Sequence, residues 1–227
     1  MWTPDGEKVV FWSDTQPPGL FWRAADASGE REQLMEREDI TTLLPNAWSP
    51  DGNELIFEHL VPDRGFDVGL LSMVGERSWR PLLNSAASER SPALSPDGEW
   101  IAYSSTETSQ EEVYIERFPE LGNRAPVSTG GGWAPVWSSD GSELFYRTLY
   151  DDRMMVVPVD TEPLLTLGTA TVVFEEAYYR TRSRRYDLAP DGRFLMIKES
   201  GGAMDALPQI VVVQNWHEEL KRLVPVN

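Results

Sequence analysis

A five-fold repeat constrains the fold of this chain more than any other sequence feature. A turn-forming quartet, typified by Ser49-Pro50-Asp51-Gly52, recurs with its aspartates 46, 46, 43 and 51 residues apart. Proline, where present, presets φ, aspartate accepts a hydrogen bond from a nearby backbone N–H, and glycine tolerates positive φ. Each copy therefore predicts a tight turn between two strands. The five turns contain Asp5 and Gly6, Asp51 and Gly52, Asp97 and Gly98, Asp140 and Gly141, and Asp191 and Gly192.

Apolar residues keep a constant distance from each turn. A large apolar residue stands three positions before each aspartate and another stands six positions after it, as Trp48 and Phe57 do around Asp51. The two positions before the second apolar residue are apolar as well, so the strand after the turn must be covered on both faces. We therefore expect the positions three before and four to six after each turn aspartate to be buried between neighbouring sheets.

Further β-rich segments complete each repeat. Four short strands per period of about 45 residues, in sheets buried on both faces, are typical of a propeller blade. The sequence thus predicts an all-β fold, a single β-propeller domain over residues 1–227, with a short helical turn after Asn215. Its five four-stranded antiparallel blades span about 1–45, 46–91, 92–133, 134–185 and 186–227. The alternative is five blades of a larger ring, whose two exposed apolar faces would favour a dimer.

The repeat resembles a known family. The turn motif, with its preceding tryptophan and following aliphatic and aromatic strand, is similar to the WD40-like PD40 repeats of TolB-type propellers. From Ser91 onward, the run Val127–Gly132 and the ending Ile210–Lys221 resemble the C-terminal propeller region of bacterial receptor-like serine/threonine kinases. The resemblance implies a sensing or protein-binding propeller in a periplasmic or extracytoplasmic location. In those relatives further blades usually precede this point, and a propeller that gates a peptidase domain is a related alternative.

Composition excludes several partners. The formal net charge is −17, which argues against binding to nucleic acid or to an anionic membrane surface. The absence of cysteine excludes disulfides, thiolate metal sites and a cysteine nucleophile. The longest aliphatic run, Ile210–Val213, is far shorter than the roughly 20 residues that span a bilayer, so we expect no membrane insertion. Residues Met1–Lys8 lack the basic start and apolar stretch of a signal peptide.

Catalytic motifs are missing. The sequence has no G-x-S-x-G elbow, no phosphate-binding G-x-G-x-x-G or Walker loop, and no H-E-x-x-H zinc motif. No helix or lysine follows Gly130–Gly132, so we interpret it as a turn rather than a phosphate cradle. We therefore expect no catalytic residue, no metal and no cofactor. The enzymatic alternative is a five-bladed glycoside hydrolase, which needs two carboxylates at the channel, whereas the first-strand segments supply only Asp187.

One segment reverses the acidic character of the chain. Residues 178–186 contain four arginines and three tyrosines, the residue types enriched at interaction hot spots. Arginine also offers bidentate hydrogen bonds to carboxylates. We predict that a protein or peptide with acidic groups binds at the channel mouth, on the end that carries the inter-blade loops. The alternative is a solvated loop that neutralises the local surface. The predicted contacts are Trp133, Tyr178, Tyr179, Arg180, Arg182, Arg184 and Arg185.

Overall fold

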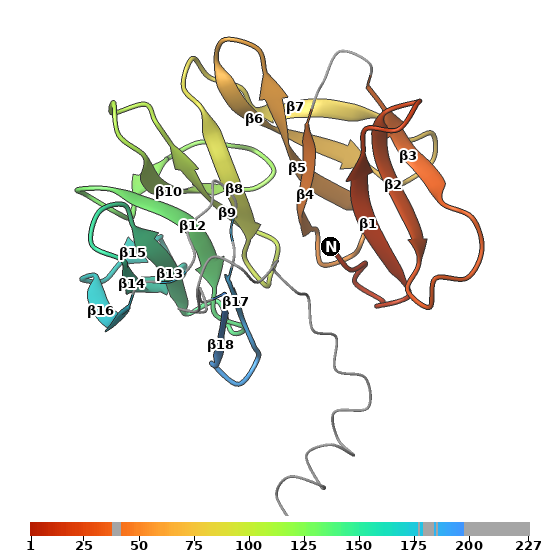
Figure 1. The fold of residues 1–227 in the computed structure, drawn as a ribbon. Coiled ribbons are helices and arrows are strands. Elements are labelled where there is room, and N and C mark those ends of the chain that lie inside the picture. Colours follow the sequence, from red (N-terminus) through yellow and green to blue (C-terminus); the bar gives the residue numbers. More distant parts are fainter. Residues whose placement is uncertain (38–41, 177, 179–183, 185, 198–227) are drawn as a thin grey trace, which may run out of the picture.

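The fold is entirely built from β-sheets in the part of the chain that the structure describes. The computed structural model describes residues 1–37, 42–176, 178, 184 and 186–197. Within these ranges the strands form five antiparallel sheets and no helix is present. The sheets follow one another in sequence order around a common centre (Figure 1). The predicted all-β propeller architecture is confirmed. The number of blades in the ring stays a prediction, and the predicted C-terminal helical turn lies outside the described residues.

Each sheet consists of strands that are consecutive in sequence. The first sheet contains β1 (Lys8–Ser13), β2 (Gly19–Ala24) and β3 (Glu32–Glu36). The second contains β4 (Leu43–Trp48), β5 (Glu54–Val61), β6 (Gly65–Ser72) and β7 (Trp79–Leu83). The third contains β8 (Glu89–Leu94), β9 (Trp100–Ser105), β10 (Glu112–Arg117) and β11 (Ala125–Pro126).

Like the three-stranded first sheet, the last two sheets depart from the four-strand order. The fourth contains β12 (Gly132–Trp137), β13 (Glu143–Thr148) and β14 (Arg153–Asp160). Both β15 (Thr166–Leu167) and β16 (Thr171–Glu175) pair with β14. The described part of the last sheet is a hairpin of β17 (Tyr186–Leu188) and β18 (Phe194–Met196). The division of the chain into five blades within one domain stays a prediction.

The repeated turns share one hydrogen-bond pattern. In the second repeat, the Ser49 hydroxyl donates to Asp51 at 2.6 Å and accepts from the backbone N–H of Glu54 at 2.9 Å. The same Asp51 oxygen accepts from the N–H of Asn53 at 3.0 Å. Gly52 adopts φ +72°, a conformation that favours glycine. The pattern recurs around Asp5, Asp97 and Asp140, so local sequence alone encodes these turns.

Neighbouring turns also pack against one another. A Cβ atom on Gly98 would lie 2.6 Å from a ring carbon of Pro50, the proline of the preceding turn. Glycine is therefore favoured at position 98 for two reasons. The backbone has a positive φ of +75°, and a side chain would clash where two sheets approach each other. A hydrogen bond joins the third and fourth sheets: the indole N–H of Trp137 donates to the carbonyl oxygen of Ala93 at 3.1 Å.

The core lies between the sheets, and its side chains are buried more completely in the middle of the chain than at the ends of the described part. Around the second turn Leu55, Ile56 and Phe57 are fully buried, as predicted. At the position three before the turn aspartate, Trp48 and Leu94 are only partly buried. The expected burial fails at both ends of the described chain, where Trp2 is 59% exposed and Leu195 is 72% exposed. The expectation is wrong there because these repeats contribute fewer described strands. Trp2 makes only an isolated bridge to Val9, and β17–β18 is a two-stranded hairpin.

Candidate functional site

A pocket lies between the first strands of three successive sheets. Strands β4, β8 and β12 are edge strands of their sheets, and β8 contacts both β4 and β12. Their ends, with the turns that follow, line an open pocket of about 280 Å³. The lining residues are Asn46, Ala47, Ala93, Leu94, Pro96, Val136, Trp137, Ser138, Ser139 and Arg184. This arrangement brings one predicted arginine, Arg184, to the inner strands.

Arg184 is the lining group that remains available to a ligand. Its side chain is partly buried, and it makes no ion pair or hydrogen bond within the described part of the chain. Asn46 already exchanges hydrogen bonds with Glu58, and the Ser138 hydroxyl donates to Asp140. A partly buried guanidinium without a carboxylate partner favours an anionic ligand, because a cation in low dielectric gains most from a nearby opposite charge.

The pocket lies at the turn end of the inner strands. Pro96, Ser138 and Ser139 belong to the turns, whereas the sequence predicted that the arginine cluster would lie at the opposite end, among the inter-blade loops. The equivalent arginine of the third repeat gives a comparison. Arg184 and Arg90 stand at the same position, seven residues before their turn aspartates. Arg90 pairs with Ser104 inside β8–β9, whereas the described pairing of β17 with β18 covers Tyr186–Leu188.

The other predicted contacts are distributed differently. Trp133 is only 8% exposed and packs in the core beside Phe145 and Tyr186, which leaves it little surface for a partner. The Tyr178 hydroxyl donates to Glu176 at 2.9 Å, and its ring lies edge-on to Phe174 at 5.8 Å. The structure therefore does not bring Trp133 and Tyr178 together with Arg184 into one exposed patch. Tyr179, Arg180, Arg182 and Arg185 lie outside the described residues.

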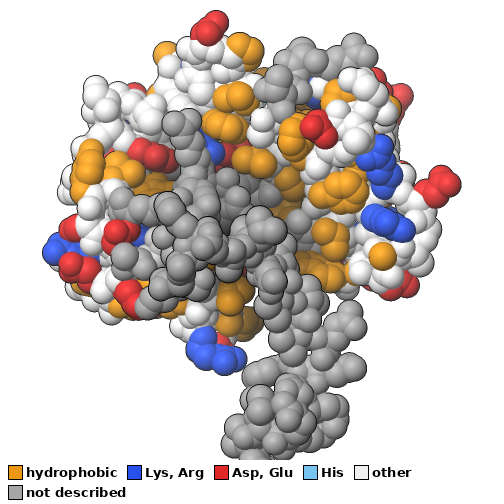
Figure 2. Space-filling view, viewed as in Figure 1, with side chains coloured by type: hydrophobic (Ala, Val, Ile, Leu, Met, Phe, Trp, Pro, Cys, Tyr) orange, Lys and Arg blue, Asp and Glu red, His pale blue; other side chains and the backbone are white. Residues whose placement is uncertain are grey.

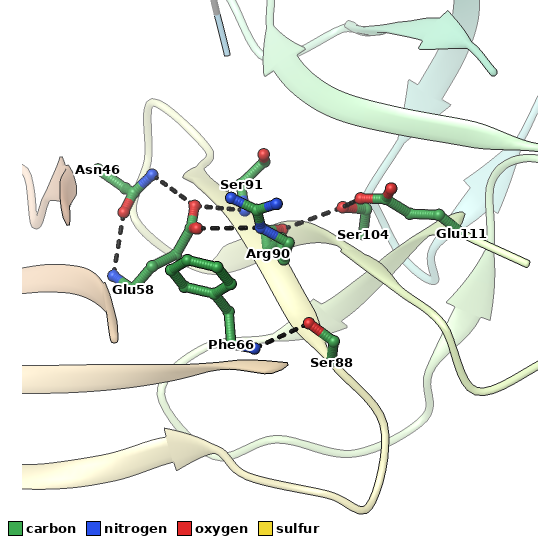
Figure 3. Close-up of polar contacts among 8 residues, drawn as sticks. All are labelled: Asn46, Glu58, Phe66, Ser88, Arg90, Ser91, Ser104 and Glu111. Carbon is green, nitrogen blue, oxygen red and sulfur yellow. Dashed lines mark hydrogen bonds and ion pairs between the residues drawn. The ribbon is translucent and has the colours of Figure 1, made fainter. Parts of the chain in front are cut away.

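A buried ionic network links the second and third sheets near the pocket. Glu58 on β5 is 2% exposed, and its carboxylate accepts hydrogen bonds from the Asn46 amide at 2.9 Å and the Ser91 backbone N–H at 2.7 Å. The Arg90 guanidinium lies 3.4 Å from the same carboxylate and 4.1 Å from the centre of the Phe66 ring. Figure 3 shows the Glu58 carboxylate enclosed by these donors.

The network holds two sheets together and leaves Glu58 unsuited to acid–base catalysis. Burial raises the pKa of Glu58, while Arg90, Ser91 and Asn46 oppose that rise. Both carboxylate oxygens already accept hydrogen bonds, so neither faces the channel as a free acid or base. Asp187, the carboxylate that the sequence offered for a glycosidase, is exposed and accepts from the N–H of Leu188 at 3.0 Å.

A second carboxylate organises the glycine-rich turn. Glu112 accepts hydrogen bonds from the N–H groups of Gly130 at 2.8 Å and Gly131 at 2.9 Å, and from the Ser128 hydroxyl. Burial alone would raise the pKa of Glu112, but these hydrogen bonds with one from Gln110 outweigh it, and the pKa lies below its usual range. The interpretation of Gly130–Gly132 as a turn fits this geometry, because the chain's own carboxylate takes the amides that a phosphate would need.

Sequence reasoning missed the Glu58–Arg90 pair. Glu58 stands seven residues after its turn aspartate, where the other repeats have Trp12, Ser104, Arg147 and Lys198. A charged residue inside the apolar run Leu55–Leu60 was the available signal, because buried carboxylates are rare unless they are paired. Its partner could not be found from spacing, since Arg90 lies 32 residues away in another sheet.

The described residues contain neither a cluster of metal ligands nor a membrane-spanning helix. Among the described residues, no group of three or more His, Cys, Asp or Glu side chains is placed to hold a metal ion. Over the same ranges, no helix has the length and apolarity needed to cross a bilayer.

Comparison with known proteins identifies the fold. No protein-family model and no curated protein sequence matches the chain. A protein assigned as TolB from Agrobacterium tumefaciens superposes with a TM-score of 0.68 at 17% identity, over 86% of this chain and 71% of the other. TolB from Acinetobacter baumannii gives 0.59 at 18% identity, over 86% of this chain and 52% of the other. The chain thus spans about half the length of that second TolB.

Propellers of other kinds are similar too. The β-propeller domain of Cps50 (Swd1) from Myceliophteria thermophila has a TM-score of 0.50 at 16% identity, over 70% of this chain and 53% of that domain. Enzymes also occur among the similar structures, including a prolyl endopeptidase with a TM-score of 0.54 at 16% identity, of which this chain covers 35%. At these identities the likeness shows the fold and leaves the activity open. The chain has the fold of a TolB-type, WD40-like β-propeller.

Proposed function

We propose that the chain is a non-catalytic interaction module that binds an acidic protein or peptide segment through Arg184 in the pocket between β4, β8 and β12. One observation carries the proposal: a partly buried guanidinium lines an open pocket of about 280 Å³ without an ion-pair partner among the described residues. The chain as a whole is strongly acidic, with a net charge of −17, so this pocket is a local attractive site for a carboxylate.

The neighbouring residues suit an extended acidic segment. Ala47, Ala93 and Val136 give the pocket an apolar wall, and Pro96 and Ser139 form its rim. Tyr179, Arg180, Arg182 and Arg185 would extend the contact to further carboxylates. A non-catalytic role is supported by the saturated hydrogen bonds of Glu58 and by the exposed position of Asp187. An extracytoplasmic location and a place in a larger kinase or peptidase stay predictions from the resemblance.

A panel of synthetic hexapeptides tests this function. Peptides with two or three Asp or Glu residues and matched amide peptides with Asn or Gln are titrated into the protein by calorimetry. We expect the acidic peptides alone to bind, and Arg184→Gln to weaken binding about tenfold or more, because a charge-assisted hydrogen bond contributes about 1.5–3 kcal/mol. Equal binding of acidic and amide peptides would contradict the proposal.

The control variant removes an arginine elsewhere. Arg153→Gln lowers the net charge by the same amount at a 41% exposed side chain that already pairs with Asp151 and Glu175. We expect Arg153→Gln to bind the acidic peptides as the unmodified protein does, with both variants melting within a few degrees of it. A fourfold change of Arg180, Arg182, Arg184 and Arg185 to Ser extends the test to the arginines outside the described residues.

A further inference from the structure

A second open pocket lies between the third and fourth sheets, where their third strands end. Its lining comes from residues 120–123, which follow β10, and from residues 161–165, which follow β14. Trp100 and Arg117 of the third sheet complete it. Its volume is about 420 Å³, within the range of about 300–1,000 Å³ that is typical of small-ligand sites. All of its lining residues are described, and none of them lines the Arg184 pocket.

Trp100 distinguishes this place from the corresponding place in other sheets. It stands three residues after its turn aspartate, where the first, second and fourth repeats have Lys8, Glu54 and Glu143. Those three residues are partly exposed, whereas Trp100 is 6% exposed. Arg117 stands directly opposite Trp100 on the neighbouring strand, and its guanidinium lies 5.0 Å from the centre of the Trp100 ring. The third sheet thus presents an aromatic ring and a cation together at this pocket.

The indole N–H of Trp100 is a hydrogen-bond donor without an acceptor in the described structure. Its nitrogen is buried and makes no hydrogen bond there. The indoles of Trp22, Trp48 and Trp137, by contrast, donate at 2.7, 3.0 and 3.1 Å. Buried polar groups are nearly always hydrogen-bonded, so the Trp100 N–H indicates an acceptor from outside the described residues. A ligand in the adjoining pocket can supply that acceptor.

Further donors line the same pocket. Arg117 pairs with Glu99 at 2.9 Å, but both side chains are about half exposed, so the pair contributes little and leaves other guanidinium N–H groups for a ligand. Asn123 and Thr161 also line the pocket, and neither side chain makes a hydrogen bond within the described ranges. Glu120 is the one carboxylate of the lining. Because donors outnumber acceptors, the pocket favours a ligand with acceptor oxygens.

Aliphatic side chains form much of the remaining wall. Leu121 is partly buried, Leu165 packs against the core cluster that contains Trp100, and Leu164 is 76% exposed at the rim. In Figure 2 side chains of both charges lie beside apolar ones over the third and fourth sheets, at the left of the view. Selection of a ligand here therefore depends on the donors and shape of the pocket rather than on the general charge of the surface.

We propose that this pocket binds the C-terminal residue of a partner protein, a chain end with an aliphatic last side chain. The terminal carboxylate accepts hydrogen bonds from Arg117, and the carbonyl oxygen of the preceding residue accepts from the Trp100 indole. The aliphatic side chain packs against Leu164 and Leu165. A chain end suits the pocket better than an internal acidic residue, whose charged side chain would face the aliphatic wall. This site is separate from the Arg184 pocket and does not depend on the proposed function.

Titration of ¹⁵N-labelled protein with acetyl-alanyl-leucine, which has a free carboxylate, tests the proposal. We expect the indole signal of Trp100, assigned from its loss in Trp100→Phe, to shift with saturation. The C-terminal amide of the same dipeptide should bind about tenfold more weakly, because it lacks the charge-assisted hydrogen bond. Acetyl-alanyl-glycine should also bind more weakly, because it lacks the aliphatic side chain. Equal binding of the acid and the amide would overturn the proposal.

Two substitutions test the two donors separately. Arg117→Gln should weaken binding of acetyl-alanyl-leucine about tenfold and leave binding of its amide unchanged. Trp100→Phe keeps a ring and removes the N–H, so it should weaken the dipeptide about fivefold, with the backbone amides of Leu164 and Leu165 reporting binding. Isocaproate has the leucine side chain and carboxylate but no peptide group, so Trp100→Phe should not change its affinity. Isocaproate that binds as tightly as the dipeptide would contradict recognition of a chain end.

Control variants separate this pocket from the Arg184 pocket and from a general effect of net charge. Arg153→Gln removes the same charge from a side chain that pairs with Asp151 and Glu175, and should leave binding of the dipeptide unchanged. Arg184→Gln should leave it unchanged too, so failure here and failure of the proposed function are distinguishable. Nuclear Overhauser effects between Leu164 and residues 198–227 without peptide would show that this chain fills its own pocket, and would overturn the proposal.

Discussion

The carboxylate of Glu58 accepts a 2.7 Å hydrogen bond from the backbone N–H of Ser91, across the boundary between the second and third sheets. Ser91 adopts φ +51°, an unusual conformation for a residue with a side chain, at the irregularity where β8 pairs with β9. Glu58 thus satisfies an amide that the irregular strand leaves without a ladder partner. The contact fixes the inner strand of one sheet to its neighbour, close to the proposed pocket.

Removal of this carboxylate should destabilise the propeller strongly. Glu58→Ala leaves Arg90 and the Ser91 amide buried without their acceptor, and breaking a buried pair costs about 3–5 kcal/mol. Glu99→Ala is the control, because its pair with Arg117 is half exposed and should contribute at most about 1 kcal/mol. Urea unfolding measures both. Equal free energies of unfolding for the two variants would contradict a structural role for Glu58.

The same residue should give stability a pH dependence. Burial raises the pKa of Glu58 above its ordinary value of 4.5, so the folded state keeps the proton after the unfolded state has lost it. This contribution to stability is full below pH 4.5 and falls as pH rises through the pKa of the folded state. Glu58→Gln keeps an acceptor and removes the titration. The melting temperature of this variant should fall less than that of the unmodified protein between pH 4.5 and neutrality.

The turn aspartates should give stability the opposite pH dependence. Hydrogen bonds from Ser138 and from the Ser142 amide lower the pKa of Asp140 to about 2, and equivalent bonds lower those of Asp5 and Asp51. Their stabilising contribution is present above the ordinary value of 3.8 and is lost as pH falls toward 2. Asp140→Asn should therefore show a smaller loss of melting temperature between about pH 4 and pH 2. If acid lowers the melting temperature of Asp140→Asn as much as that of the unmodified protein, the assigned role of Asp140 in the turn is wrong.

Tryptophans that precede the turns should differ in their contribution. Trp137 is 7% exposed and donates to Ala93, so Trp137→Ala should cost about 3–5 kcal/mol as a large-to-small core change. Trp48 is only partly buried, and Trp48→Ala should cost less. Trp2→Ala is the surface control, because Trp2 is 59% exposed. Guanidinium unfolding should rank the three variants in that order, and any other order would contradict the burial assignment.

The repeat could predict much of the fold because the turns are local. Ser49, Asp51 and Gly52 make their hydrogen bonds within six residues, so the sequence of one turn contains its whole structure. Glu58 and Arg90 were missed because their contact joins different positions of two repeats. Trp133 was expected at the surface as an aromatic contact, but packing against residues of β13 and β17 buries it beside Tyr186.

The sequence did not predict that Arg184 lies at the turn end of the propeller, and the reason is related. Arg184 was expected at the loop end because it belongs to the arginine-rich segment that precedes the fifth turn motif, among the inter-blade loops. In the part of the chain that the structure describes, β17 pairs with β18 over three residues, and Arg184 lies two residues before them, beside the turns of neighbouring sheets. Strand length at the end of a repeat array depends on neighbouring sheets, which a turn motif does not encode.

A crystal structure of the chain with the tightest-binding acidic hexapeptide tests the central claim most directly. The account predicts a peptide carboxylate within ion-pair distance of the Arg184 guanidinium, in the pocket between Ala93 and Trp137. The same crystals grown from Arg184→Gln protein should lack the peptide there. A peptide bound among the inter-blade loops, with Arg184 free of it, would contradict the claim.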